Sequence, residues 1–121
     1  MTYNDFTEMP IWQKAMDIAV HIQQKTVGFP KTEDYGVTSQ IRRAALSIAS
    51  NIAEGFGRNH TKDKLNFYYF SRGSIMETRS HLLYCQKVAY LSNDEVKPIH
   101  ENLQQLTIEL NKLIKTLQSK L

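Results

Sequence analysis

The sequence has little of what builds a disulfide-stabilised, membrane-embedded or disordered protein. Its single cysteine, Cys85, cannot form an internal disulfide, and a reducing compartment is expected. No stretch approaches the roughly 18 continuous apolar residues of a membrane span. Residues 1–9 are polar and acidic, without the apolar run of a signal peptide, so we expect a cytoplasmic protein. Hydrophobic residues make up 41% and charged residues 22%, which argues against disorder.

Proline and glycine are also scarce, with three and five copies, so long uninterrupted elements are expected. Apolar residues recur every three or four positions, which predicts helices and no strands. In the last helix this seam is Val96, Ile99, Leu103, Leu106, Leu110, Leu113 and Leu117. Stop and start signals come from Gly28 with Phe29-Pro30, Gly55 with Gly57, and the capping-box pair Ser92 and Glu95. We predict one all-α domain over residues 1–121, an antiparallel up-down-up-down four-helix bundle with helices at about 10–27, 38–55, 61–91 and 93–119.

The third helix has more apolar residues than one core face needs. Its predicted core stripe is Leu65, Tyr69, Met76, Leu83 and Tyr90. The rings of Phe67, Tyr68 and Phe70 cannot all join that stripe at ~100° per residue. A helix that is apolar around most of its circumference is buried on more than one side. We therefore predict a homo-oligomer with Phe67, Tyr68, Phe70 and Gly73 at the subunit contact, where the glycine permits close helix approach.

Positive charge is concentrated in the middle of the chain. The net charge is +3, yet residues 42–87 alone carry eight Lys or Arg against three acids, and all five arginines lie there. Such clustering is typical of proteins with acidic partners, including nucleic acids. We expect phosphate contacts from Arg58, Lys62, Lys64 and Arg72, while a solvated basic face is the simpler alternative.

Catalytic and cofactor motifs are missing from the sequence. The four histidines are scattered, and the Glu77-His81 pair lacks the further ligands of a di-iron bundle, so we predict no metal and no cofactor. The glycines Gly55 and Gly57 indicate a helix end, because no strand precedes them and no Gly-Lys-Ser/Thr follows. We expect a protein that is not an enzyme, with a metal-dependent enzyme as a distant alternative.

The stretch from Gln40 to Ala45, with Ser47-Ile48 and the run from Asn51 to Arg58, resembles the signature of a bacterial four-helix-bundle family. Its members are encoded in intervening sequences of 23S ribosomal RNA genes and are described as ribosomal-protein-like. Further segments match the same pattern in order, so the resemblance covers nearly the whole chain: residues 12–16, 29–30, 35–38 and 73–77.

That family is similar to the accessory variability determinants of diversity-generating retroelements. The resemblance implies a ring-like homopentamer with a basic surface that binds RNA or DNA. It also implies a reverse transcriptase or a ribosomal component as a further partner, and no membrane. The alternative is a protein-binding scaffold that docks a partner through the aromatic surface of the third helix, without nucleic acid.

The polar residues of the signature have a structural interpretation of their own. Arg42 lies on the apolar arc of the second helix, where a guanidinium must reach solvent or meet a carboxylate. Its candidate partners are Glu54 and Glu77. The small residues around it indicate tight helix packing, so ion pairs are favoured over direct RNA contact. We assign this structural role to Arg42, Arg43, Asn51, Glu54 and Glu77.

Overall fold

The computed structural model describes residues 2–121, so Met1, the first residue of the predicted domain and of its polar N-terminal segment, lies outside the described part. The elements in chain order are η1 (Phe6–Glu8), α1 (Pro10–Lys25), η2 (Lys31–Glu33), α2 (Val37–Gly57), α3 (Thr61–Lys87) and α4 (Asn93–Gln118). No strand occurs within residues 2–121. The predicted all-α class with four long helices is therefore confirmed.

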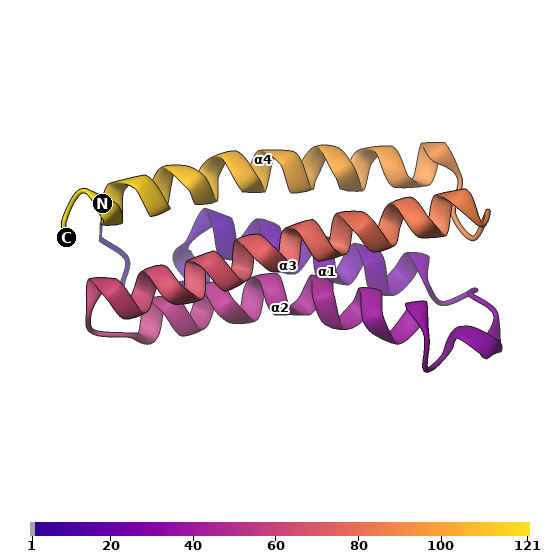
Figure 1. Ribbon diagram of the computed structural model, residues 1–121, viewed down its shortest axis with the longest axis horizontal. Coiled ribbons are helices and arrows are strands. Elements are labelled where there is room, and N and C mark those ends of the chain that lie inside the picture. Colours follow the sequence, from indigo (N-terminus) through magenta and orange to yellow (C-terminus); the bar gives the residue numbers. More distant parts are fainter. Residues whose placement is uncertain (1) are drawn as a thin grey trace.

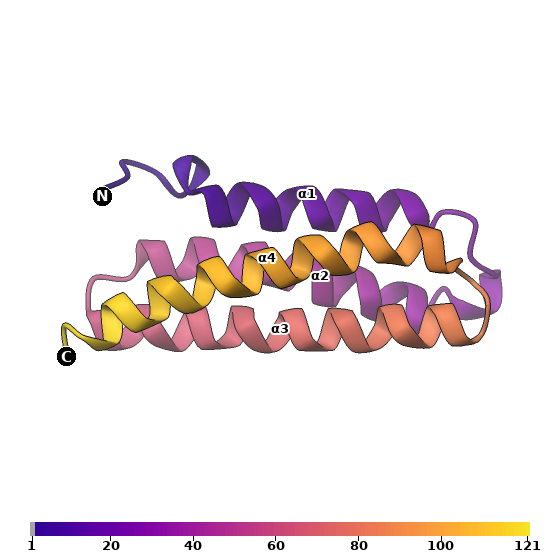
Figure 2. The ribbon, with the colours of Figure 1, turned by 90° about the horizontal axis from the view of Figure 1, so that it is seen from above.

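The four helices run alternately in opposite directions along one axis (Figure 1). Each helix packs against two neighbours, α1 against α2 and α4, and α3 against α2 and α4. Helices α1 and α3 consequently lie on opposite sides of the bundle (Figure 2). The C-terminal end of α2, the N-terminal end of α3 and the C-terminal end of α4 lie together at the end that also holds both chain termini (Figure 1).

The core is built from one apolar stripe on each helix. The stripes of α1 and α2 bury Ile11, Ala15, Ile18, Ile22, Val37, Ile41, Ala45, Ile48 and Ile52. Six of the seven residues predicted for the α4 seam are buried, while Ile114 is buried in place of Leu113, which is only partly covered. A 3.6-residue helix drifts against a strict seven-residue repeat, which accounts for this shift by one position.

Helix α3 turns a different side to the core from the one predicted. Its buried residues are Leu65, Tyr68, Ser71, Ile75, Thr78, Leu82 and Cys85, whereas the predicted core residues Met76 and Leu83 are exposed. Two hydroxyl side chains make this side appear polar in the sequence. Ser71 donates to the carbonyl of Ile48 (2.8 Å), and Thr78 donates to the carbonyl of Ser74 (2.8 Å). Both are satisfied by backbone oxygens, so they are buried at little cost.

Two helix ends also differ from prediction. Helix α3 stops at Lys87 rather than near residue 91, because Ala89 adopts a left-handed conformation (φ 64°) and the amides of Tyr90 and Leu91 turn back to the Cys85 carbonyl. Helix α2 continues through Gly55 to Gly57. Gly55 makes room for a neighbouring ring instead of ending the helix, since a Cβ atom there would lie 2.7 Å from Cε1 of Tyr68.

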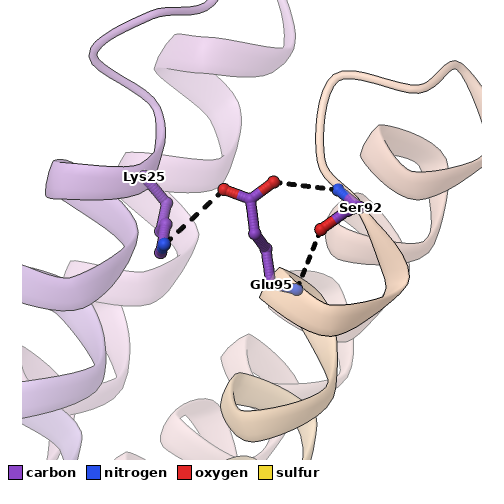
Figure 3. Close-up of polar contacts among 3 residues, drawn as sticks. All are labelled: Lys25, Ser92 and Glu95. Atoms are coloured by element: carbon purple, nitrogen blue, oxygen red, sulfur yellow. Dashed lines mark hydrogen bonds and ion pairs between the residues drawn. The ribbon is translucent and has the colours of Figure 1, made fainter.

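The predicted capping box at the start of α4 is present (Figure 3). Ser92 Oγ accepts from the Glu95 amide (3.1 Å), and Glu95 Oε1 accepts from the Ser92 amide (3.0 Å). The other carboxylate oxygen lies 3.5 Å from Lys25 Nζ, at the end of α1. The hydrogen bonds from Ser92 hold the pKa of Glu95 below its ordinary value. This cluster fixes the α1 end against the α4 start.

Candidate nucleic-acid interface

Three of the four predicted phosphate-contacting residues, Arg58, Lys62 and Lys64, lie where α2 ends and α3 begins, whereas Arg72 lies near the middle of α3. The four also differ in how many contacts their side chains make within the chain. Lys62 is exposed and forms no hydrogen bond or ion pair with another residue in 2–121. Arg58 is exposed, with its guanidinium 3.4 Å from the Glu54 carboxylate and 4.6 Å from the centre of the Phe67 ring. Both side chains can reach a phosphate at the cost of weak surface contacts.

Lys64 and Arg72 are tied into the bundle. The Lys64 ammonium donates to the carbonyls of Gly55 (3.3 Å) and Phe56 (2.9 Å) in the last turn of α2, and the Gly55 carbonyl also accepts from the Arg58 amide (3.3 Å). Partial burial lowers the pKa of Lys64. Lys64 therefore caps the C-terminal end of α2, and a phosphate contact by Lys64, which stays a prediction, would compete with these two hydrogen bonds. Arg72 donates to Asn111 Oδ1 (3.1 Å) and lies over the Tyr69 ring, joining α3 to α4.

Three lysines at the end of α4 were missed by the sequence reasoning. Lys112, Lys115 and Lys120 are exposed, and α4 ends beside the start of α3, where Gln118 donates to the Tyr69 hydroxyl (2.9 Å). Residues 88–121 carry equal numbers of basic and acidic side chains, so their net charge gives no sign that the lysines gather toward the C-terminal end. Three of the four acids of α4 precede residue 102, and three lysines follow residue 111. Such an arrangement also suits the helix dipole, which favours cations at the C-terminal end.

The exposed cations of these end segments make up what we call the basic end: Arg58, Lys62, Lys112, Lys115 and Lys120. The acids at the same end are partly engaged elsewhere. Glu54 pairs with Arg58, and Asp5 and Glu8 cap η1. The chain therefore brings cations from three separate segments to the same end of the bundle, with Lys112 on the side of α4 that faces the start of α1. A polyanion that spans this end can contact them.

The signature residues hold helices together, but not by the ion pairs predicted. Arg42 Nε donates to Thr26 Oγ1 (2.8 Å) at the end of α1, and neither Glu54 nor Glu77 reaches it. Glu54 pairs with Arg58, and Glu77 lies 3.2 Å from His81 Nε2. The prediction of a carboxylate partner for Arg42 is thus wrong, since a threonine hydroxyl at the helix end satisfies the guanidinium instead.

The two remaining signature residues differ in exposure. Asn51 donates to the carbonyl of Ser47 (2.8 Å) one turn earlier and is half-buried. Arg43 is exposed and makes no hydrogen bond or ion pair with any residue in the described part of the chain. A structural role is therefore visible for Asn51, whereas Arg43 is available to another molecule.

The four predicted subunit-contact residues lie in three different surroundings. Phe67 and Phe70 form an edge-to-face pair (ring centres 5.9 Å apart) on the outer side of α3, and Phe70 is 58% exposed. Tyr68 is only 3% exposed, because its ring fills the space above Gly55, so it cannot contact another subunit or stack on a base. Gly73 faces open space, so no helix of the same chain approaches it, and the close approach of a helix from another subunit there stays a prediction.

The titratable groups elsewhere do not converge on one place. In residues 2–121, no three His, Cys, Asp or Glu side chains are grouped so that they could hold a metal ion. Burial raises the pKa of the Cys85 thiol to about 11, with a contribution from the charge of Glu33, which disfavours the nucleophilic thiolate. Across the same range, every helix is too short or too polar to cross a membrane.

Comparison with known proteins points to one family. A family model described as "23S rRNA-intervening sequence protein" matches residues 7–112. A solved structure from Bacteroides thetaiotaomicron, described as a protein of unknown function from the S23 ribosomal protein family, is similar with a TM-score of 0.78. The match covers 87% of this chain and 98% of that one at 21% identity, which supports the fold alone. No curated protein matches the chain.

Proposed function

We propose, since the chain belongs to the family of 23S rRNA-intervening sequence proteins, that it is a non-catalytic homo-oligomer that binds RNA through its basic end. The observation that carries the proposal is that exposed cations of three segments, Arg58 after α2, Lys62 in the first turn of α3, and Lys112 and Lys115 in the last two turns of α4, belong to helix ends that share one end of the bundle. Phosphate neutralisation by exposed cations supplies most of the affinity in binding that does not read sequence.

Oligomerisation matters for affinity because one basic end holds few free cations. A single patch of this size binds weakly at physiological salt, and several copies that engage one RNA add avidity without new contacts. The exposed rings of Phe70 and Tyr84 on α3 support a protein–protein contact there. A pentameric ring, a reverse transcriptase or ribosomal component as partner, and a cytoplasmic location are parts of the proposal that rest on the family resemblance.

The second candidate function is a protein-binding scaffold, favoured by the same exposed apolar surface of α3. In that case the basic end is a solvated surface whose lysines only complement the α4 dipole. The two functions differ in the residues that matter, since a scaffold needs the α3 surface and no lysine of the basic end.

The test compares two triple variants that change the net charge equally. One replaces Lys62, Lys112 and Lys115 by glutamine, and the control replaces Lys31, Lys87 and Lys97, which are exposed at the opposite end of the bundle. Binding of a structured RNA should weaken at least about tenfold in the first variant and little in the control. Equal losses in both variants would indicate only a net-charge effect, and equal affinities to the parent would contradict RNA binding at the basic end.

A further inference from the structure

Helix α3 carries a second regular stripe on the side that its own bundle leaves uncovered. The residues of this outer stripe recur at alternating spacings of three and four, and each is at least partly exposed: Phe67, Phe70, Ser74, Glu77, His81, Tyr84 and Val88. Alternating spacings of this kind are typical of helix seams that pack against another helix. Its apolar members lie toward the two ends, Phe67 and Phe70 at one and Tyr84 with Val88, just beyond α3, at the other, and polar residues with Glu77 in the middle separate them. The outer stripe therefore offers two apolar contacts on either side of a charged centre.

A second uncovered apolar surface lies between α1 and α2. It is a groove of about 510 Å³ lined by apolar parts of Met16, Ala19, Val20 and Leu46, with Arg42 and Arg43 also in its wall. Val20 is 49% exposed and Leu46 is 50% exposed. A groove between two helices accepts the apolar face of a third helix, which is a recurring mode of recognition.

The charges of these two surfaces are complementary. The outer stripe carries Glu77 at its midpoint, and the groove carries Arg42 and Arg43. Arg43 has no partner in residues 2–121, and the carboxylate of Glu77 contacts only the adjacent His81. A twofold contact of stripe with stripe would bring two Glu77 carboxylates together at the axis, and a contact of groove with groove would oppose arginines.

We infer that the outer stripe of α3 in one copy of this chain seats in the α1/α2 groove of the next copy, with Glu77 facing Arg43. This contact joins unlike surfaces, so it leaves a free groove on one subunit and a free stripe on the other until the assembly closes. The groove lies between α1 and α2, and α3 packs against α2 as well, so the outer stripe and the groove belong to different sides of the same subunit. Because each subunit keeps one stripe and one groove, the same contact repeats from copy to copy and closes a ring when its rotation divides a full turn. The inference rests on the homo-oligomer of the proposed function.

The test uses two variants that each destroy one surface. The stripe variant carries Phe70→Glu and Tyr84→Glu, and the groove variant carries Val20→Glu and Leu46→Glu. All four side chains are exposed within the chain, so helicity by circular dichroism should equal that of the parent. Each variant alone should sediment as a single chain. Their equimolar mixture should sediment as a heterodimer of twice that mass, because one intact stripe and one intact groove remain.

Charge reversal supplies a second test with less change in apolar surface. Arg43→Glu and Glu77→Arg should each weaken assembly by about tenfold, and the double variant should regain most of the loss. The inference is overturned if the groove variant assembles like the parent, if the mixture yields no heterodimer, or if the double reversal is no better than the single ones. A parent that sediments as one chain would overturn the oligomer of the proposed function as well, whereas an assembled parent without the heterodimer would overturn this contact alone.

Discussion

The ring of Tyr68 lies directly over Gly55, so that a Cβ atom at position 55 would approach its Cε1 to 2.7 Å and its Cζ to 3.0 Å. The absence of a side chain at Gly55 therefore lets the Tyr68 ring of α3 lie against α2 at this point. We predict that Gly55→Ala lowers the free energy of unfolding by about 1–3 kcal/mol, because the buried ring must shift within a packed core. Chemical denaturation of parent and variant measures the difference.

The matched control is the same substitution at Gly73, where nothing lies within 4 Å of the added carbon. Alanine is the better helix former at an exposed site, so Gly73→Ala should raise the free energy of unfolding by up to about 1 kcal/mol. If both substitutions stabilise the protein, the contact between Gly55 and Tyr68 is not close enough to matter.

Glycine at position 89 should make the protein more stable than the alanine found there, because Ala89 holds a left-handed backbone (φ 64°) after the end of α3. A residue with a Cβ atom is destabilised by about 1–2 kcal/mol in that conformation. Glycine removes this strain, but it also raises the conformational entropy of the unfolded chain, which offsets part of the gain in stability. Ala89→Gly should therefore raise the melting temperature slightly. Ala53→Gly, within α2, should lower it by the usual helix penalty. A lower melting temperature for Ala89→Gly would contradict the left-handed turn.

His100 should make stability fall at acidic pH. Burial, together with the nearby charge of Arg79, lowers its pKa from the ordinary 6.5 in the folded state. Near neutral pH the ring is uncharged in both states and has no effect. As pH falls below 6.5 the unfolded chain takes up the proton first, so folded stability is lost between 6.5 and the lower folded pKa. The melting temperature of the parent should drop more between neutral and acidic pH than that of His100→Gln, and equal drops would contradict this.

Cys85 should be unreactive in the folded protein. Its side chain is buried and its pKa is raised to about 11, so little thiolate exists at mildly alkaline pH. Alkylation by iodoacetamide should be slow in buffer and fast in denaturant. Rapid modification of the native protein would show that α3 opens locally around Cys85.

Much of the fold could be predicted because local signals agreed with one another. The seam of α4 and the pair Ser92 and Glu95 are both read from spacing alone, and both recur in the structure. The core face of α3 was predicted wrongly because Ser71 and Thr78 are polar residues in the sequence. In the structure their hydroxyls donate to backbone carbonyls, which allows both side chains to be buried. The left-handed Ala89 had no sequence signal, since alanine normally continues a helix.

The candidate site was less predictable, since it depends on which helix ends meet. Lys64 carries the same charge as Lys62, and only the carbonyls of Gly55 and Phe56 distinguish their roles. Lys112 and Lys115 are far from these residues in the chain, and they share an end of the bundle with them only because antiparallel packing brings the end of α4 beside the start of α3. Arg42 donates to Thr26 rather than to an acidic residue, and this partner depends on how α1 ends.

The central claim, that the basic end binds RNA by neutralising phosphates, is tested most directly by the salt dependence of affinity. The parent protein is titrated against a structured RNA at several salt concentrations, and the logarithm of affinity is plotted against the logarithm of salt. We predict a steep negative slope, with about 0.7–0.9 contributed by each phosphate contact. An affinity that does not change with salt, or no binding even at low salt, would contradict the account and favour the protein-binding scaffold.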